Sequence, residues 1–293
     1  MTVKKKRIWE LDFWRGLAII LVVFDHAFFD FGRLFYQWKD CGVTALEWLN
    51  SIGVAYLESD VRAFWRPAFL FLFFCVSGLC TALSKNNFLR GVKLWTVAAC
   101  LSALTFLADV LFDADVFILF GVLHCLAVVI ILYSVFELIM KGIFLLVEKI
   151  RKKPIKENWK AVIFFIATIA LSVAFYLINR KFNPLLIDVE THGTVSELDG
   201  KLFGMFFYSK EWWTGDYFPV FPYISFFFFG AAISKLIYRE KKSLFPFLDG
   251  IWHAPFTVAG KHSLAVYLIG QVAAIGLGII LTLAFLGSSS LFF

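Results

Sequence analysis

The sequence predicts an all-α protein, a polytopic transmembrane helix bundle of about seven spans. Its 293 residues are 60% hydrophobic and only 17% charged, and the mean hydropathy is +0.79. A soluble domain is usually about half apolar and about a quarter charged, so this chain falls outside that class. A membrane-spanning helix needs about 20 consecutive apolar residues. Runs of roughly that length lie at 11–31, 64–84, 91–110, 117–139, 160–179, 219–238 and 262–287. We expect them to form a single domain, residues 1–293.

The loops between these spans alternate between strongly basic and weakly basic. Lysine and arginine gather before the first span and then in every second loop, at 4–7, 85–93, 140–160 and 235–261. Cytoplasmic loops carry the excess of Lys and Arg. The N-terminus is therefore expected in the cytoplasm, and an odd number of spans places the C-terminus outside. The net charge of +6 thus reflects topology, and we expect the lipid bilayer, not nucleic acid, as a partner.

Two long segments, 32–63 and 180–218, fall on the extracytoplasmic side. The first contains VTALEWLNSIGVAYLE, whose apolar residues recur at helical spacing, so it predicts a helix along the membrane surface. The second becomes aromatic toward its end, in FGMFFYSKEWWTGDYFPVFPY. The five cysteines form no CxxC pair, so the sequence predicts neither a disulfide framework nor a metal site.

The first span carries ionisable residues that are costly at membrane depth. RGLAIILVVFDH runs from Arg15 to His26, and a full span must also include Asp25 and Asp30. Such groups usually face a bundle interior or a water-filled cavity. Eleven steps of about 100° bring His26 back to within roughly 20° of the face of Arg15. Asp12, three residues before Arg15, and Asp30, four after His26, share this stripe.

The stripe suits an elongated ligand with an anionic end at Arg15 and a reacting end at His26, roughly 16 Å away. A cytosolic acyl-CoA has that shape, and Arg15 would hold its phosphates or its pantetheine arm. His26 would act as a general base or accept the acyl group. Asp30 or Asp25 would orient the ring, and we favour Asp30 because Asp25 points about 100° aside. The alternative is an anchoring arginine and a buried structural histidine.

The segment RIWELDFWRGLAIILVVFDHAFFDFG resembles the start of the heparan-alpha-glucosaminide N-acetyltransferase catalytic-domain family, and its R-x10-H spacing is similar to that of membrane acyltransferases that O-acylate bacterial surface sugars. FLFFCVSGLCTALSKNNFLRGVKLW, FILFGVLHCLAVV, DYFPVFPYISFFFFGAAISKLIY and AGKHSLAVYLIGQ resemble later family segments in the same order. The resemblance implies a multi-pass enzyme of the bacterial plasma membrane that passes an acetyl group from acetyl-CoA, its co-substrate, to an extracytoplasmic sugar or glycan. It places His26 on the catalytic histidine and Arg15 on the motif's arginine. In YLIGQ, Gly270 replaces the histidine of many bacterial relatives.

Further residues are candidates for binding acyl-CoA. Besides Arg15 and Asp12, the predicted cytoplasmic side offers Asn86, Asn87, Arg90, Lys261, His262 and Ser263. The segment GKHS stands at the start of the last span, where backbone N–H groups and the lysine could bind phosphate. Helix capping and the positive-inside bias explain that segment equally well, and the loop at 85–93 could be only a polar turn.

Candidates for the acceptor site lie near the extracytoplasmic side or in family segments: His124, Trp213, Asp216, Tyr217 and Gln271. Aromatic faces beside a carboxylate suit a sugar, although an aromatic belt at the membrane interface would give the same pattern. A core histidine is the alternative for His124.

Two other classes of function compete with the acyltransferase. A transporter or flippase could use the Arg, Asp and His residues of the first span as a relay, but the paired repeats typical of transporters are not found in the sequence. A non-catalytic scaffold could use the same residues to join helices. The acceptor's identity and a homodimer stay open.

Overall fold

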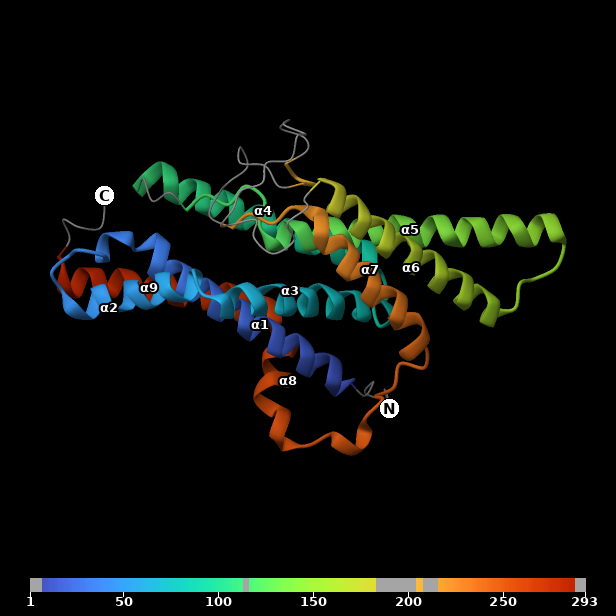
Figure 1. The fold of residues 1–293 in the computed structure, drawn as a ribbon. Helices are drawn as coiled ribbons and strands as arrows, with labels where there is room; N and C mark the ends of the chain where they lie inside the picture. Colours follow the sequence, from blue (N-terminus) through green and yellow to red (C-terminus); the bar gives the residue numbers. More distant parts are fainter. Residues whose placement is uncertain (1–6, 113–115, 183–203, 208–215, 288–293) are drawn as a thin grey trace. The chain divides into compact units, whose positions relative to one another are not determined.

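The computed structural model describes residues 7–112, 116–182, 204–207 and 216–287. Regular structure within these ranges is helical, as predicted (Figure 1). Six of the described helices are long and apolar enough to cross a membrane. They are α3 (Asp60–Leu79), α4 (Asn87–Phe112), α5 (Val122–Arg151), α6 (Glu157–Phe182), α7 (Val220–Ile237) and α9 (Ser263–Phe285). These correspond to the last six predicted spans, although α5 continues well past its expected end at 139. The polytopic helical bundle is therefore confirmed.

The first predicted span, 11–31, forms α1 (Trp9–Phe29) but does not belong to these six. Its length is sufficient, but Glu10, Asp12, Arg15 and Asp25 make it too highly charged. The structure thus gives six spans by length and composition where the sequence predicts about seven. That α1 crosses the membrane stays a prediction, as do the sides of the two termini.

Contacts between Cα atoms divide the chain into two compact units. One comprises Met1–Ile8 and Phe74–Leu244, and the other comprises Trp9–Phe73 and Phe245–Phe293. The boundary falls inside α3. The first predicted span and the last one therefore belong to the same unit, although they lie at opposite ends of the sequence.

In the unit of Trp9–Phe73 and Phe245–Phe293, α8 (Ala254–Lys261) packs against the first half of α1 (Figure 1). Glycines allow the two backbones to meet. A Cβ atom on Gly16 would lie 1.8 Å from the carbonyl oxygen of Phe256, and one on Gly260 would lie 1.7 Å from that of Asp12. Only a residue without a side chain fits at either position. This contact fixes the start of α9, which follows α8 directly.

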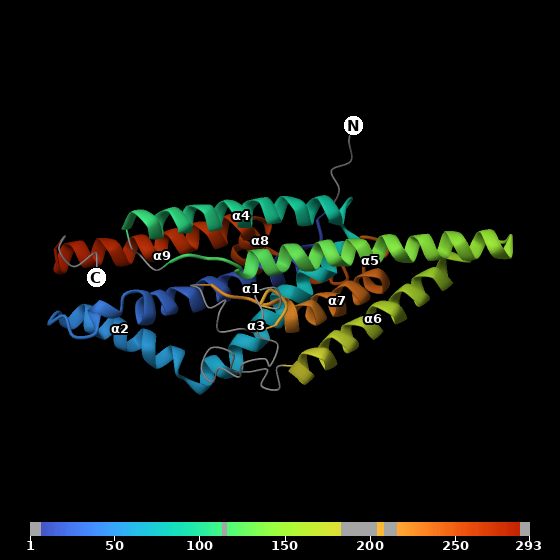
Figure 2. The same ribbon diagram turned by 90° about the horizontal axis from the view of Figure 1, so that it is seen from above.

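The C-terminal end of α1 changes its helical geometry. The chain continues as a π-helical turn over Asp30–Leu34, and α2 (Thr44–Leu57) packs against that turn (Figure 2). A Cβ atom on Gly53 would lie 2.5 Å from the nitrogen of Gly32, and the Asn50 amide donates to the carbonyl oxygen of Phe31 at 3.0 Å. The helix predicted within 43–58 is confirmed as α2, and it covers this turn.

The other unit is built from α4–α7 and the end of α3, and an aromatic cluster fills its core. Tyr133 of α5 is fully buried and packs edge-on against Phe227 and Phe228 of α7 and Phe164 of α6. Gly78 and Gly230 let α3 and α7 meet backbone to backbone, because a Cβ atom on Gly78 would lie 2.1 Å from the carbonyl oxygen of Phe227.

Candidate active site

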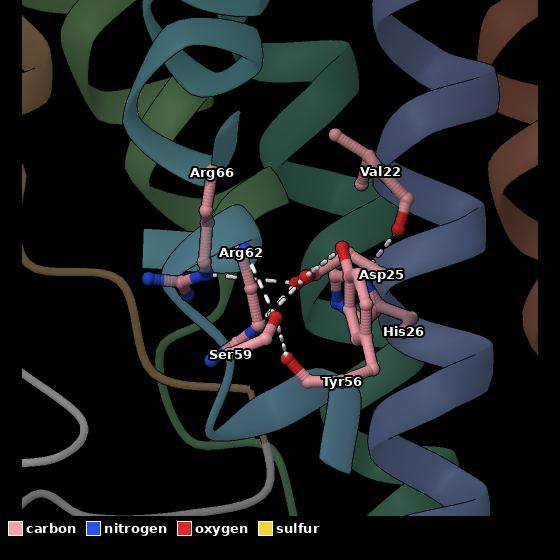
Figure 3. Close-up of polar contacts among 7 residues, drawn as sticks. All are labelled: Val22, Asp25, His26, Tyr56, Ser59, Arg62 and Arg66. Atoms are coloured by element: carbon pink, nitrogen blue, oxygen red, sulfur yellow. Dashed lines mark hydrogen bonds and ion pairs between the residues drawn. The ribbon is translucent and has the colours of Figure 1, made fainter. Parts of the chain in front are cut away.

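His26 lies on α1 with its ring held from two sides. Nδ1 donates a hydrogen bond to the carbonyl oxygen of Val22, one turn earlier, at 2.9 Å (Figure 3). The ring of Tyr267, from α9, meets it edge-on with the centroids 5.8 Å apart. A neutral imidazole that donates from Nδ1 carries its lone pair on Nε2. Nε2 is therefore the atom of His26 that can accept a proton or attack an acyl carbon.

Asp25 is the centre of a buried ionic cluster that joins α1 to α2 and α3 (Figure 3). Arg62 binds it in a bidentate manner through one edge of its guanidinium, Nε to Oδ1 at 2.8 Å and Nη2 to Oδ2 at 3.3 Å. Nε of Arg66 lies 3.5 Å from Oδ2, and the Tyr56 hydroxyl donates to Oδ1 at 3.1 Å. The carboxylate of Asp25 thus holds three helices together.

The start of α3 explains why both arginines face α1. The Ser59 hydroxyl accepts a hydrogen bond from the Arg62 backbone nitrogen at 3.2 Å, which is the contact of an N-cap residue. Arg62 and Arg66 are four residues apart and therefore share one face of the helix.

On the neighbouring helix α2, burial and the adjacent Asp25 carboxylate raise the pKa of Tyr56 to about 12. Tyr56 therefore keeps the proton that it donates.

Asp30 lies one turn beyond His26, where the α-helix gives way to the π-helical turn. Its carboxylate is buried, and its backbone oxygen accepts from the nitrogen of Phe35 at 2.9 Å. π-helical turns are rare, and those that do occur are frequently found at functional sites. The predicted role of Asp30 in orienting His26 stays a prediction.

Arg15 and the GKHS segment meet at the other end of α1. Nη1 of Arg15 lies 3.5 Å from Oδ1 of Asp12, the pair predicted from their spacing, and donates to the carbonyl oxygen of Gly260 at 3.3 Å. Lys261 and His262 follow at the exposed junction between α8 and α9, and α9 begins at Ser263. Predicted nucleotide-binding residues from both ends of the chain therefore lie close together.

The predicted contacts of the 85–93 loop belong to the other unit, where each has a partner in the protein. Asn86 caps α4, since its Oδ1 accepts from the Leu89 nitrogen at 3.0 Å. The Asn87 amide donates to Glu137 of α5 at 3.3 Å, and Arg90 donates to the carbonyl oxygen of Ser77 at 3.2 Å. These contacts fit the alternative of a structural turn, and nucleotide binding stays a prediction.

His124 and Asp216 lie together at the N-terminus of α5. Nδ1 of His124 accepts from the Gly121 nitrogen at 3.3 Å, and its Nε2 lies 3.2 Å from the Ser102 hydroxyl. Oδ2 of Asp216 accepts from the Val122 nitrogen at 3.2 Å. Both side chains thus satisfy backbone donors of the first turn, where a carboxylate also complements the helix dipole. These contacts fit the alternative that His124 is a structural histidine of the core. Binding of the acceptor by His124 or Asp216 stays a prediction.

The remaining acceptor candidates lie in different places. The Tyr217 hydroxyl donates to the carbonyl oxygens of Gly204 and Phe207, so it fastens the short segment 204–207. Trp213 lies outside the described residues. Gln271 belongs to α9, one turn after Tyr267.

Comparison with known protein families identifies the family of this chain. The family model of heparan-alpha-glucosaminide N-acetyltransferase, catalytic, matches residues 7–272. The chain belongs to the heparan-alpha-glucosaminide N-acetyltransferase catalytic family. No curated protein and no solved structure matches it. With its six membrane-capable helices, this member of the family is a multi-pass membrane acetyltransferase of that general kind.

Sequence reasoning about this acetyltransferase missed the partners of Asp25. Arg62 precedes the predicted span at 64–84, and Arg66 lies at its first turn. From the sequence alone, both were assigned only as basic residues on the extracytoplasmic side. Their spacing of four residues was the available signal, because it places two cations on one helix face. The sequence gives no reason to pair that face with Asp25, which lies 37 residues away from Arg62 in the sequence.

Proposed function

We propose that this chain is an acyltransferase of the plasma membrane that transfers an acetyl or other small acyl group from cytosolic acetyl-CoA to an extracytoplasmic sugar or glycan. Membership of the acetyltransferase family supports the reaction class. The observation that carries the proposal is the hydrogen bond from Nδ1 of His26 to the Val22 carbonyl oxygen, which in a neutral ring leaves the lone pair on Nε2. A histidine held in one tautomer is prepared for proton transfer.

In the proposed reaction, Nε2 of His26 takes the proton of an acceptor hydroxyl or amine as that group attacks the thioester carbonyl carbon. The carbon–sulfur bond then breaks, and the imidazolium returns the proton to the CoA thiolate. In the covalent variant, Nε2 attacks first and carries the acyl group. Asp30, one turn away, is the proposed orienting carboxylate. Asp25, bound to Arg62 and Tyr56, would act by fixing the position of α1.

The CoA end of the site is proposed at the first turns of α1. Arg15 contacts the Gly260 carbonyl oxygen, which brings the guanidinium next to Lys261 and the start of α9. Phosphates favour such a place, because cationic side chains and the N-terminal N–H groups of a helix both attract anions. His262, Ser263 and Asp12 complete this proposed group.

Isothermal titration of the purified protein with acetyl-CoA and with desulfo-CoA tests the proposal. We expect both to bind, and we expect Arg15→Ala to weaken both, because its proposed partner is the part of CoA that they share. Failure of the wild-type protein to bind either ligand would contradict the proposal and favour a transporter or a scaffold. Mixing the protein with acetyl-CoA labelled in the acetyl group, without acceptor, separates the two variants, since only the covalent one leaves label on the protein.

A further inference from the structure

Gln271 of α9 has a buried amide nitrogen that forms no hydrogen bond with any part of the chain that the structure describes. Buried donors in native proteins are nearly always paired, because removing an N–H group from water without an acceptor is costly. An exception calls for an explanation. One explanation is that the acceptor arrives with a ligand.

The packing of α9 fixes the direction in which Gln271 points. Tyr267, one turn earlier, is buried beside His26, and a Cβ atom on Gly270 would lie 2.6 Å from the Val23 side chain of α1. Around the helix axis, Gln271 lies about 40° from Tyr267 and about 100° from Gly270. It therefore shares the face of α9 that packs on α1. Val272 is 73% exposed and lies on the opposite side.

The same contacts place Gln271 near the proposed reacting end of the ligand. Val23 and His26 are three residues apart on α1 and therefore neighbours on its surface. Gly270 contacts the first of them and Tyr267 meets the ring of the second. Gln271 lies beside Gly270 in the sequence and one turn beyond Tyr267. Its amide and the imidazole of His26 thus project from two packed helices into one neighbourhood.

We propose that Nε2 of Gln271 donates a hydrogen bond to the carbonyl oxygen of the thioester, an inference that rests on the proposed acyltransferase function. When the acceptor oxygen or nitrogen attacks the carbonyl carbon, the electron pair of the C=O bond moves onto that oxygen. The negative charge is lost again when the carbon–sulfur bond breaks and the thiolate leaves. A neutral amide donor stabilises this oxyanion without adding a charge to the membrane interior. Gln271 is thereby a catalytic residue.

The replacement Gln271→Leu tests this assignment, because it keeps the approximate size and removes the N–H group. We expect kcat to fall by about 10²–10³, as for loss of one oxyanion donor, while the affinity for acetyl-CoA falls by less than about tenfold, as for loss of one neutral hydrogen bond. The temperature of unfolding should stay the same or rise, because the variant no longer buries an unsatisfied donor. The control Val272→Leu, on the exposed side of the same turn, should keep the wild-type kcat.

The carbonyl stretch of bound acetyl-CoA, labelled with carbon-13 at the carbonyl, gives a readout apart from turnover. A hydrogen bond from Gln271 lowers the frequency in the wild type, and Gln271→Leu should raise it. Equal frequencies with a kcat within twofold of the wild type would overturn the assignment while the acyltransferase function stands. A lower unfolding temperature with a proportional loss of active protein would mean a structural role. A wild-type protein that neither binds acetyl-CoA nor transfers acetyl groups would overturn the proposed function itself.

Discussion

Replacing Asp25 by asparagine should be among the most destabilising polar substitutions in α1. The carboxylate receives Nε of Arg62 at 2.8 Å, Nη2 at 3.3 Å and the Tyr56 hydroxyl at 3.1 Å, and the side chains of Asp25 and Arg62 are only 7% and 10% exposed. Asparagine retains an acceptor for Tyr56 but removes the charge beside two guanidinium groups. Removing one partner of a buried ion pair typically costs about 3–5 kcal/mol, so we expect a loss of that size.

Reversible unfolding in mixed micelles, followed by circular dichroism, measures this loss. Arg62→Met should also destabilise, and the double variant should be clearly more stable than the sum of the two losses predicts, because it removes both charges together. The matched control is Arg33→Gln. Its pair with Glu58 spans 4.0 Å between side chains that are 57% and 61% exposed, so we expect less than about 1 kcal/mol. If Asp25→Asn cost no more than this control, the cluster would not hold the helices together.

Three further predictions follow from packing, charge and topology. Gly260→Ala should abolish the folded state, since its Cβ would meet a backbone oxygen at 1.7 Å, whereas Gly142→Ala, with open space around it, should keep the wild-type yield and unfolding temperature. The fold raises the pKa of Tyr56 to about 12, so its contribution to the free energy of unfolding should be complete below pH 10 and lost as the pH rises through 12. Tyr56→Phe should remove this pH dependence of the free energy of unfolding between pH 10 and pH 12. In intact cells, a membrane-impermeant maleimide should label Cys41, which is predicted outside, but not the new thiol of Lys152→Cys, which is predicted in the cytoplasm. The reverse labelling pattern would overturn the predicted topology.

Hydropathy and helical spacing were enough to predict most of the fold. Six spans were placed correctly because a run of about 20 apolar residues has a local signature. The amphipathic spacing within 43–58 likewise located α2. The pairing of Asp12 with Arg15 followed from helix geometry alone.

What the sequence did not yield depends on contacts between distant segments. Arg62 meets Asp25, and Gly16 meets α8, only after helices pack, and no periodicity within one helix encodes its neighbour. The π-helical turn at Asp30 was missed for the same reason, because a neighbouring helix packs against it. The sequence also gives no sign of the contacts that residues of the 85–93 loop make inside the protein, such as that of Asn87 with Glu137, and their predicted role in nucleotide binding stays a prediction.

The catalytic role of His26 is tested most directly by acetyl transfer with purified wild-type and His26→Ala proteins. Transfer from labelled acetyl-CoA to a panel of amino sugars and glycans is measured together with acetyl-CoA binding on the same preparations. We predict that His26→Ala lowers the rate by about 10²–10⁴, as for loss of a general base, while acetyl-CoA binding and the unfolding temperature stay close to the wild type. A His26→Ala protein that transfers acetyl groups at the wild-type rate would contradict the catalytic role of His26.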